Sequence, residues 1–201
     1  MHRCMAAVLL VLSWKAVAQE NWQKAKMSDA QLTTEQIAVY RAVLREYLKG
    51  SERTLNLASV TEPIDSSDKT CFKGMDARDI KESASVIHRI ESLVAADSNI
   101  VLVDPGRQQT PIKENDPQNL IRNAIHDGQK VTDEQLEQAV KSAFDSGLSE
   151  LSEIVFDKGH RRAVVAYSFV CGELCGSGDK LVLKKIGSDW RVAKRCGGWV
   201  S

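Results

Sequence analysis

The cysteines restrict the fold of this chain more than any other feature of its sequence. Five are present among 201 residues, and Cys4 falls in an N-terminal segment with the composition of a secretory signal peptide. The other four are Cys71, Cys171, Cys175 and Cys196. An even number of cysteines in an exported chain favours disulfide bonds over free thiols. The sequence therefore predicts two disulfides, which tie together a C-terminal half that is rich in β-strands.

Residues 1–18 have the three parts of a signal peptide. Arg3 gives a basic start, residues 4–14 form an apolar run, and Ala16-Val17-Ala18 supplies the small residues that a signal peptidase reads. The apolar run has about 11 residues, which is too few for a helix that crosses a bilayer. We expect cleavage after Ala18 and a periplasmic or secreted protein without a transmembrane segment.

Cleavage changes the composition of the chain from neutral to mildly acidic. The full sequence carries 27 basic and 27 acidic residues, and removal of the signal peptide leaves 183 residues with 25 basic and 27 acidic. A near-neutral chain is not typical of nucleic-acid binders, which are usually basic. The hydrophobic content of 43% is that of an ordinary globular protein. We expect a flexible segment over residues 19–32 and a single domain over residues 33–201.

Hydrophobic periodicity and capping signals predict helices first and strands afterwards. The expected helices cover residues 33–50, 77–95, 116–128 and 132–147, and a polar loop is expected over 106–115. The expected strands cover residues 53–60, 99–103, 151–156, 162–171, 179–186 and 190–199. The last three strands follow one another at about ten-residue spacing, as in an antiparallel meander. The sequence therefore predicts an α+β fold, with N-terminal and central helices packed on a C-terminal antiparallel β-meander.

The expected meander favours one of the three pairings that four cysteines allow. Cys171 and Cys196 would lie on its two outer strands, about 9–10 Å apart, since neighbouring strands are separated by about 4.8 Å. A disulfide does not span that distance. We therefore prefer Cys171–Cys175 with Cys71–Cys196. The pairing of Cys71 with Cys171 and of Cys175 with Cys196 stays open.

A glycine-rich segment between two of the strands is the most distinctive local motif. It reads Cys-Gly-Glu-Leu-Cys-Gly-Ser-Gly over residues 171–178. Such a segment can form an anion-binding nest of backbone N–H groups, but a tight hairpin loop closed by a disulfide is the simpler interpretation. Together with two tryptophans it gives a candidate binding surface of Gly172, Glu173, Gly176, Gly178, Trp190 and Trp199.

Two alternatives assign chemistry to a turn rich in charged residues. Glu153, Asp157 and His160 combine carboxylates with a histidine, which could act as acid and base in a small hydrolase. Cys171, Cys175 and His160 could instead hold a metal ion, although structural zinc sites usually carry Cys-x-x-Cys pairs. His88 lies beside the apolar face of a predicted helix, where we expect it to be packed or half-exposed.

The motifs of common enzyme classes are missing from the sequence. It contains no Gly-x-Ser-x-Gly, no His-Glu-x-x-His and no dinucleotide-binding fingerprint. We therefore expect a binding or interaction protein of the bacterial envelope rather than an enzyme. Its partner would be a protein or a small molecule and not a nucleic acid, and we expect no cofactor.

The C-terminal part of the chain resembles a family of uncharacterised secreted bacterial proteins. The pattern that carries the resemblance is Cys-Gly-x-Leu-Cys-Gly-x-Gly, followed by a strand, a tryptophan and a closing Trp-x-Ser. The residues that match it are Cys171, Gly172, Leu174, Cys175, Gly176, Gly178, Trp190, Trp199 and Ser201. The resemblance implies a bacterial and exported origin, and it carries over no catalytic residue.

Overall fold

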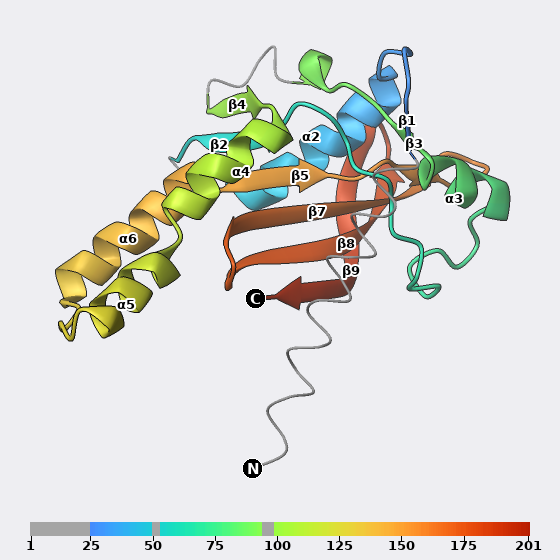
Figure 1. Ribbon diagram of the computed structural model, residues 1–201. Helices are drawn as coiled ribbons and strands as arrows, with labels where there is room; N and C mark the ends of the chain where they lie inside the picture. The colour runs from blue at the N-terminus through green and yellow to red at the C-terminus, as the bar shows by residue number, and fades with distance from the viewer. Residues whose placement is uncertain (1–24, 50–52, 94–98) are drawn as a thin grey trace.

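The computed structural model describes residues 25–49, 53–93 and 99–201 (Figure 1). The predicted signal peptide and the first six residues of the segment 19–32 lie outside this part of the chain. Within it, none of the helices combines the length and the apolar character that a membrane crossing requires.

The described chain contains five α-helices, one 3-10 helix and nine strands, and its last five elements are all strands. In order they are β1 (Lys26–Met27), α2 (Thr34–Leu48), β2 (Leu55–Ala58), α3 (Ala77–Ser83), β3 (Val86–Ile87), the 3-10 helix η1 (Glu91–Leu93), β4 (Ile100–Val103), α4 (Pro105–Glu114), α5 (Pro117–His126), α6 (Asp133–Ser146), β5 (Leu148–Leu151), β6 (Val155–Phe156), β7 (Arg162–Gly172), β8 (Cys175–Ile186) and β9 (Asp189–Val200). The predicted α+β class is confirmed.

The large sheet is mixed rather than antiparallel throughout. Its strands run in the order β4-β2-β5-β7-β8-β9, and β6 pairs with β7 beside this path. The strands β4, β2 and β5 are parallel to one another, whereas β5, β7, β8 and β9 are antiparallel. Strands β7, β8 and β9 form the predicted meander, but they are only part of a wider sheet, to which β2 and β4 from earlier in the chain are joined through β5 (Figure 1).

Side-chain caps fix the start of the helices that the sequence predicted best. The capping boxes of Thr33 with Gln36 and of Thr132 with Gln135 are both formed, and they open α2 and α6. Asp116 caps α5 by accepting the N–H of Gln118. Each cap satisfies backbone donors that have no partner inside the helix.

Residues 106–115 form most of a helix, so the prediction of a polar loop there is wrong. Asp104 accepts the N–H of Arg107 at 2.8 Å, and Pro105 occupies the first position of α4. Proline is well suited to that position because its missing N–H would have no partner there. The sequence Asp-Pro-Gly, which suggested a turn, is therefore the start of a helix.

The predicted helix over residues 77–95 is confirmed over its first seven residues and wrong over residues 84–90, while residues 94 and 95 lie outside the described chain. After α3 the chain becomes extended, because the hydroxyl of Ser83 donates to the carbonyl of Ile154 and β3 pairs with β1. Ile87 and Ile90 are buried from this extended segment and not from a helix face. The strand predicted over 151–156 is likewise divided between β5 and β6.

The described part of the segment 19–32, which was expected to be flexible, is attached to the domain. Lys26 and Met27 pair in parallel with Val86 and Ile87. Leu32 is 6% exposed and packs into the main hydrophobic core.

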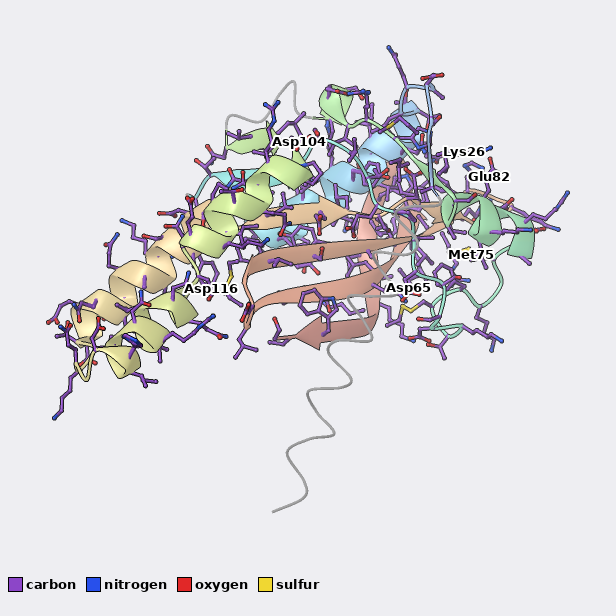
Figure 2. The ribbon with its side chains drawn as sticks, viewed as in Figure 1. Lys26, Asp65, Met75, Glu82, Asp104 and Asp116 are labelled. Carbon is purple, nitrogen blue, oxygen red and sulfur yellow. A yellow bond between two sulfur atoms is a disulfide. The ribbon has the colours of Figure 1, made fainter. Side chains whose placement is uncertain are left out.

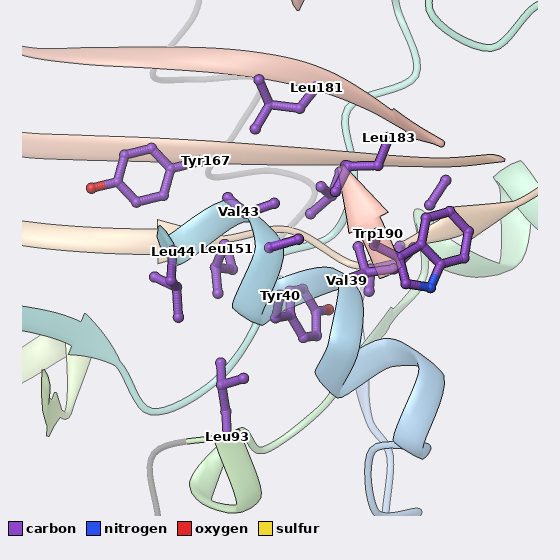
Figure 3. Close-up of a cluster of buried hydrophobic side chains, with 14 of the residues drawn as sticks. Val39, Tyr40, Val43, Leu44, Leu93, Leu151, Tyr167, Leu181, Leu183 and Trp190 are labelled. Carbon is purple, nitrogen blue, oxygen red and sulfur yellow. The ribbon is translucent and has the colours of Figure 1, made fainter. Parts of the chain in front are cut away.

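The main core lies between α2 and one face of the sheet, as Figure 3 shows. Val39, Tyr40, Val43 and Leu44 come from the helix. The sheet contributes residues that alternate along its strands, including Leu151, Val165, Tyr167, Leu181 and Leu183. This face of the sheet is consequently closed to solvent near α2.

Among the described residues, those that cover the opposite face of the sheet lie at its two ends. At one end Val164 and Val182 pack under Ile64, Cys71 and Phe72. At the other end Ile112 of α4 packs on Ala58 and Leu148. In Figure 1 this second face is turned to the viewer, with α4, α5 and α6 on its left and α3 on its right. Between these two clusters Glu150, Ser168 and Trp199 are half-exposed, and Gly178 is buried beneath the ring of Trp199.

Two disulfides join the four cysteines in the pairing that the sequence favoured. Cys71 is bonded to Cys196, with a Cα–Cα distance of 5.6 Å, and Cys171 is bonded to Cys175, with a distance of 5.0 Å. The first connects the segment before α3 to β9, and the second closes the turn between β7 and β8.

Candidate functional site

The half-exposed part of the second face carries a row of four residues from four neighbouring strands. Glu150 of β5 is paired with Ser168 of β7, Ser168 with Gly178 of β8, and Gly178 with Trp199 of β9. Side chains at paired positions lie on the same face of a sheet. We call this row, together with Glu62 beside it, the open strip.

Two carboxyl groups meet at one end of the open strip. Glu62 follows β2, and its backbone is hydrogen bonded to that of Leu151 and Glu153 at the end of β5. Burial raises the pKa of the Glu150 carboxyl well above its usual range, and the adjacent Glu62 carboxyl raises this pKa further. Two carboxylates in contact cannot both ionise easily, so this pair retains a proton at a pH where ordinary glutamates have lost theirs.

Ser168 is the polar neighbour of this pair. Its hydroxyl donates to Oε2 of Glu150 at 3.4 Å, which lowers the Glu150 pKa slightly against the larger effects of burial and of Glu62. A long hydrogen bond of this kind is weak. The hydroxyl is therefore able to turn toward another acceptor on the open side of the sheet.

Trp199 lies over two glycines at the other end of the strip. A Cβ atom on Gly178 would be 2.4 Å from Nε1 of the indole, and one on Gly176 would be 3.1 Å from its ring carbons. The two glycines therefore give the indole a flat seat on β8, and the ring remains half-exposed above it. This contact explains why glycine recurs at alternate positions of a strand, where it normally weakens the sheet.

Replacement of Gly178 by alanine is expected to displace the indole of Trp199 from its position over β8. The added methyl group overlaps Trp199, so we expect a loss of about 1–2 kcal/mol in the free energy of unfolding, as for other overpacked sites. Guanidinium titration followed by circular dichroism measures this change. Ser177→Ala, at an exposed neighbouring position on the other face, is the matched control and should change stability by less than about 0.5 kcal/mol. Equal stability of both variants would show that the indole does not depend on this seat.

Gly172 and Glu173, two further members of the predicted surface, hold the hairpin against α5 instead of lining the strip. Oδ2 of the buried Asp116 accepts the N–H of Glu173 at 2.8 Å, while Oδ1 accepts the N–H of Gln118 at 2.9 Å. A Cβ on Gly172 would be 2.9 Å from the Asp116 carboxyl carbon, so glycine permits this close approach. Figure 2 shows Asp116 and Asp65 on opposite flanks of the sheet face.

Trp190 is not available as a surface residue. Its side chain is 3% exposed and belongs to the main core beneath α2, where its ring lies 5.7 Å from that of Phe156. It therefore lies on the opposite face of the sheet from Trp199. The prediction placed the two tryptophans together because they flank one strand. Positions 190 and 199 are an odd number of residues apart, however, so alternation along β9 puts them on opposite faces, and the two bulges where β9 pairs with β8 cancel in this respect.

The three residues of the hydrolase hypothesis are not brought together. Glu153 is 2% exposed and lies 2.9 Å from Nδ1 of His88, a histidine that the hypothesis did not include. His160 contacts Glu35, with 2.8 Å between Nδ1 and Oε2. Asp157 accepts backbone N–H groups within its own turn. Each of the three thus has a separate structural partner.

The two cysteines of the metal-binding hypothesis are not available as thiolate ligands. Cys171 and Cys175 are bonded to each other, so neither sulfur is a free ligand in this state. Over residues 25–49, 53–93 and 99–201, no group of three or more histidine, cysteine, aspartate or glutamate side chains is arranged to hold a metal ion.

A wide hollow of about 480 Å³ lies away from the strip, between α5 and α6. Asn119, Gln135 and Gln138 are among the residues that line it, and it opens broadly to solvent. Pockets that bind small molecules are usually enclosed and bury most of the ligand surface. The hollow therefore lacks the enclosure of a typical ligand site.

Sequence reasoning missed the carboxyl pair, although one signal was present. The stretch Leu-Ser-Glu-Leu at residues 148–151 reads as a strand in which a glutamate occupies the same face as Leu148. A charged residue on the inner face of a strand requires a partner. The partner, Glu62, is 88 positions away in the sequence, and no local pattern points to it.

Comparisons of the chain with known protein families, with characterised proteins and with solved structures find no match. The candidate site therefore stands on its own residues: the Glu62–Glu150 pair, the hydroxyl of Ser168 and the indole of Trp199.

Proposed function

We propose that this protein is a binding protein of the bacterial envelope and that its ligand contacts the open strip. The two disulfides support an oxidising compartment, as does the N-terminal sequence with the composition of a signal peptide. The observation that carries the proposal is the placement of a half-exposed indole and a carboxyl pair on one uncovered row of the sheet.

The chemistry of the strip indicates what kind of ligand it would accept. An indole face offers a flat apolar surface to a sugar ring, an aromatic ring or a cation. The carboxyl pair and the Ser168 hydroxyl offer hydrogen-bond acceptors and, because the pair holds a proton, a donor as well. A ligand with one flat face and several hydroxyl or amino groups fits both ends of the strip.

The carboxyl pair also lowers the stability of the fold, which supports a functional role. Some half-buried carboxylates here have cationic partners, such as Asp65 with Lys180 at 2.8 Å and Asp179 with Arg195 at 2.7 Å, and the buried Asp116 accepts backbone N–H groups. Glu150 instead faces another acid. Residues with strongly shifted pKa values concentrate at functional sites, where activity is maintained at the expense of stability.

Replacement of Glu150 by glutamine is expected to stabilise the protein at neutral and alkaline pH. The pKa of Glu150 is raised in the folded state. The contribution of this carboxyl to stability is therefore fully present below the usual glutamate pKa of 4.5, and it is lost as the pH rises through the folded-state pKa. Glutamine does not titrate, so Glu150→Gln should equal the wild type near pH 4 and exceed it by about 1–2 kcal/mol at pH 8. Thermal unfolding at both pH values measures this.

Glu137→Gln is the control for that experiment, because Glu137 is exposed on α6. It should shift the unfolding temperature little at either pH. If Glu150→Gln were destabilising at pH 8, the Glu62–Glu150 pair would not carry the unfavourable interaction described above.

Binding at the strip is tested by nuclear magnetic resonance with a defined panel of probes. Oligosaccharides, aromatic amines and short basic peptides are titrated into the oxidised protein, and the indole N–H of Trp199 and the amide of Ser168 are followed. We expect at least one class to shift both signals, with loss of the shifts or at least a tenfold weaker affinity in Trp199→Ala. Ile186→Ala, at the exposed far end of β8, should bind normally. Shifts confined to other surfaces would contradict the proposal.

Acid–base catalysis is a second candidate, favoured by the proton that Glu62 and Glu150 share. Such a pair can donate a proton from one carboxyl and accept one at the other, as required for hydrolysis. A screen with chromogenic glycoside, ester and peptide substrates would detect it. Turnover that disappears in both Glu150→Gln and Glu62→Gln would favour catalysis, whereas tight binding without turnover would favour the binding role.

A further inference from the structure

The helices α5 and α6 form a hairpin that extends beyond the end of the sheet (Figure 1). No residue of α5 is buried, and Ala143 and Ser146 are the buried residues of α6. Helices in proteins gain most of their stability by burying an apolar side. Among the described residues, five of the ten exposed large hydrophobic side chains belong to this hairpin, with exposed fractions from 39% to 75%. We call them the apolar side: Ile121, Ile125, Leu136, Val140 and Phe144.

These five side chains lie on one side of the hairpin. Within each helix they recur every four residues, so they form a line along it. The hollow described above lies on the opposite side, because Asn119 and Gln138 line it. Ile121 and Val140 each follow one of these two residues by two positions, which is about 200° around a helix of 3.6 residues per turn. Since α5 and α6 run antiparallel, both lines fall on the side away from the hollow.

The apolar side begins on the face of the sheet that α2 covers. Phe144 stacks on Phe169 of β7, with 5.5 Å between the ring centroids, and Phe169 packs against the main core. The open strip lies on the other face of the sheet. A partner on the apolar side therefore does not need to cover the open strip.

Two charged residues that border the apolar side on α6 are complementary to themselves under a two-fold rotation. Glu137 and Lys141 are exposed and directly follow Leu136 and Val140 in the sequence. When two copies of α6 meet antiparallel, Glu137 of each copy lies level with Lys141 of the other. The same alignment sets Leu136 of each copy beside Val140 of the other. A two-fold interface joins the same surface of both subunits and requires such self-complementarity.

We propose that the protein forms a two-fold symmetric dimer, in which the apolar sides of two α5–α6 hairpins pack face to face with the α6 helices antiparallel. The two α5 helices then lie beside this central contact, so that Ile121 and Ile125 are covered as well. Four helices packed in this way bury their apolar residues in a common core, as in a four-helix bundle. The ion pairs between Glu137 and Lys141 at the border fix the orientation of the two copies more than they add to affinity.

The first test measures the mass of the protein in solution by sedimentation velocity. We expect the wild type to be a dimer at concentrations up to about 0.1 mM, which a micromolar dissociation constant gives. Val140→Glu places a carboxylate in the centre of the apolar contact, so it should weaken dimerisation at least tenfold. Ile186→Glu, at the exposed far end of β8, is the matched control and should dimerise as the wild type does. Circular dichroism verifies that both variants are folded.

Two results of that experiment would overturn the proposal. A wild-type protein that is monomeric at every concentration would mean that the apolar side receives a different partner. A Val140→Glu variant that dimerises as strongly as the wild type would place the contact elsewhere on the molecule.

Charge reversal tests the antiparallel orientation. Glu137→Lys leaves two bases at the border and Lys141→Glu leaves two acids, so each variant alone should dimerise at least tenfold more weakly than the wild type. An equimolar mixture of the two variants should form a heterodimer, because each base then meets an acid. Glu137→Gln adds no repulsion and should weaken dimerisation less than about threefold. A mixture that stays monomeric, or single variants that dimerise as strongly as the wild type, would overturn this orientation.

Discussion

Replacement of both Cys71 and Cys196 by alanine is expected to lower the free energy of unfolding by about 5 kcal/mol. The bond closes a loop across a sequence separation of 125 residues, and the entropy that a cross-link removes from the unfolded chain grows with the length of that loop. The bond also holds the segment before α3 on the sheet, where Ile64 and Phe72 cover Val164 and Val182. Guanidinium titration of the oxidised variant gives the magnitude.

The variant with alanine at Cys171 and Cys175 is the matched control. It also lacks one disulfide, but its loop spans only four positions, so a loss of about 2 kcal/mol is expected. A comparable loss in both variants would mean that chain entropy is not the main source of stabilisation by the long-range bond. A large loss in the control alone would show that the short bond, and not the long-range one, stabilises the fold.

The sequence predicted elements whose ends carry their own chemical signals. Two helix starts carry a capping-box pattern, Thr33 with Gln36 and Thr132 with Gln135, and both capping boxes are formed. The sequence did not reveal α4, because Asp104 and Pro105 begin a helix and a turn equally well, and the residues that follow are polar. The outcome depends on Ile112, which α4 places on Ala58 and Leu148. That tertiary contact has no signature in the local pattern.

Parallel pairing is the other part of the fold that the sequence did not predict. The segments of β2 and β4 were both recognised as strands, but nothing local indicates that they lie beside β5 rather than in a separate layer. The candidate site depends on this arrangement, because Glu62 follows β2 and Glu150 lies on β5. Glycines with an evident turn role were identified, whereas the seat of Trp199 on Gly176 and Gly178 required the register of β8 and β9.

Replacement of His88 by alanine is expected to destabilise the protein by about 3 kcal/mol at neutral pH. Nδ1 of His88 lies 2.9 Å from Oε1 of the buried Glu153, which also accepts the hydroxyl of Thr61. Removal of one partner leaves a buried carboxylate with fewer hydrogen bonds, which costs more than the loss of the bond itself. The His88 side chain is largely buried, so water does not fully replace it.

The pH dependence of that loss separates the electrostatic effect from simple loss of packing. Burial already raises the pKa of Glu153 above its usual 4.5, while the hydrogen bonds from Thr61 and His88 oppose the rise. Without His88 the pKa rises further, so the variant keeps Glu153 neutral at moderately acidic pH and loses stability as the pH increases. We expect the deficit relative to the wild type to be smallest near pH 4 and largest near pH 8, as measured by thermal unfolding. When the effect of His88→Ala is measured in the Glu153→Gln background, the resulting loss of stability should no longer depend on pH in this way, because glutamine does not titrate. A deficit in His88→Ala that is constant from pH 4 to pH 8 would identify the cavity left by the imidazole as its cause, since a cavity does not titrate and the unpaired carboxylate does.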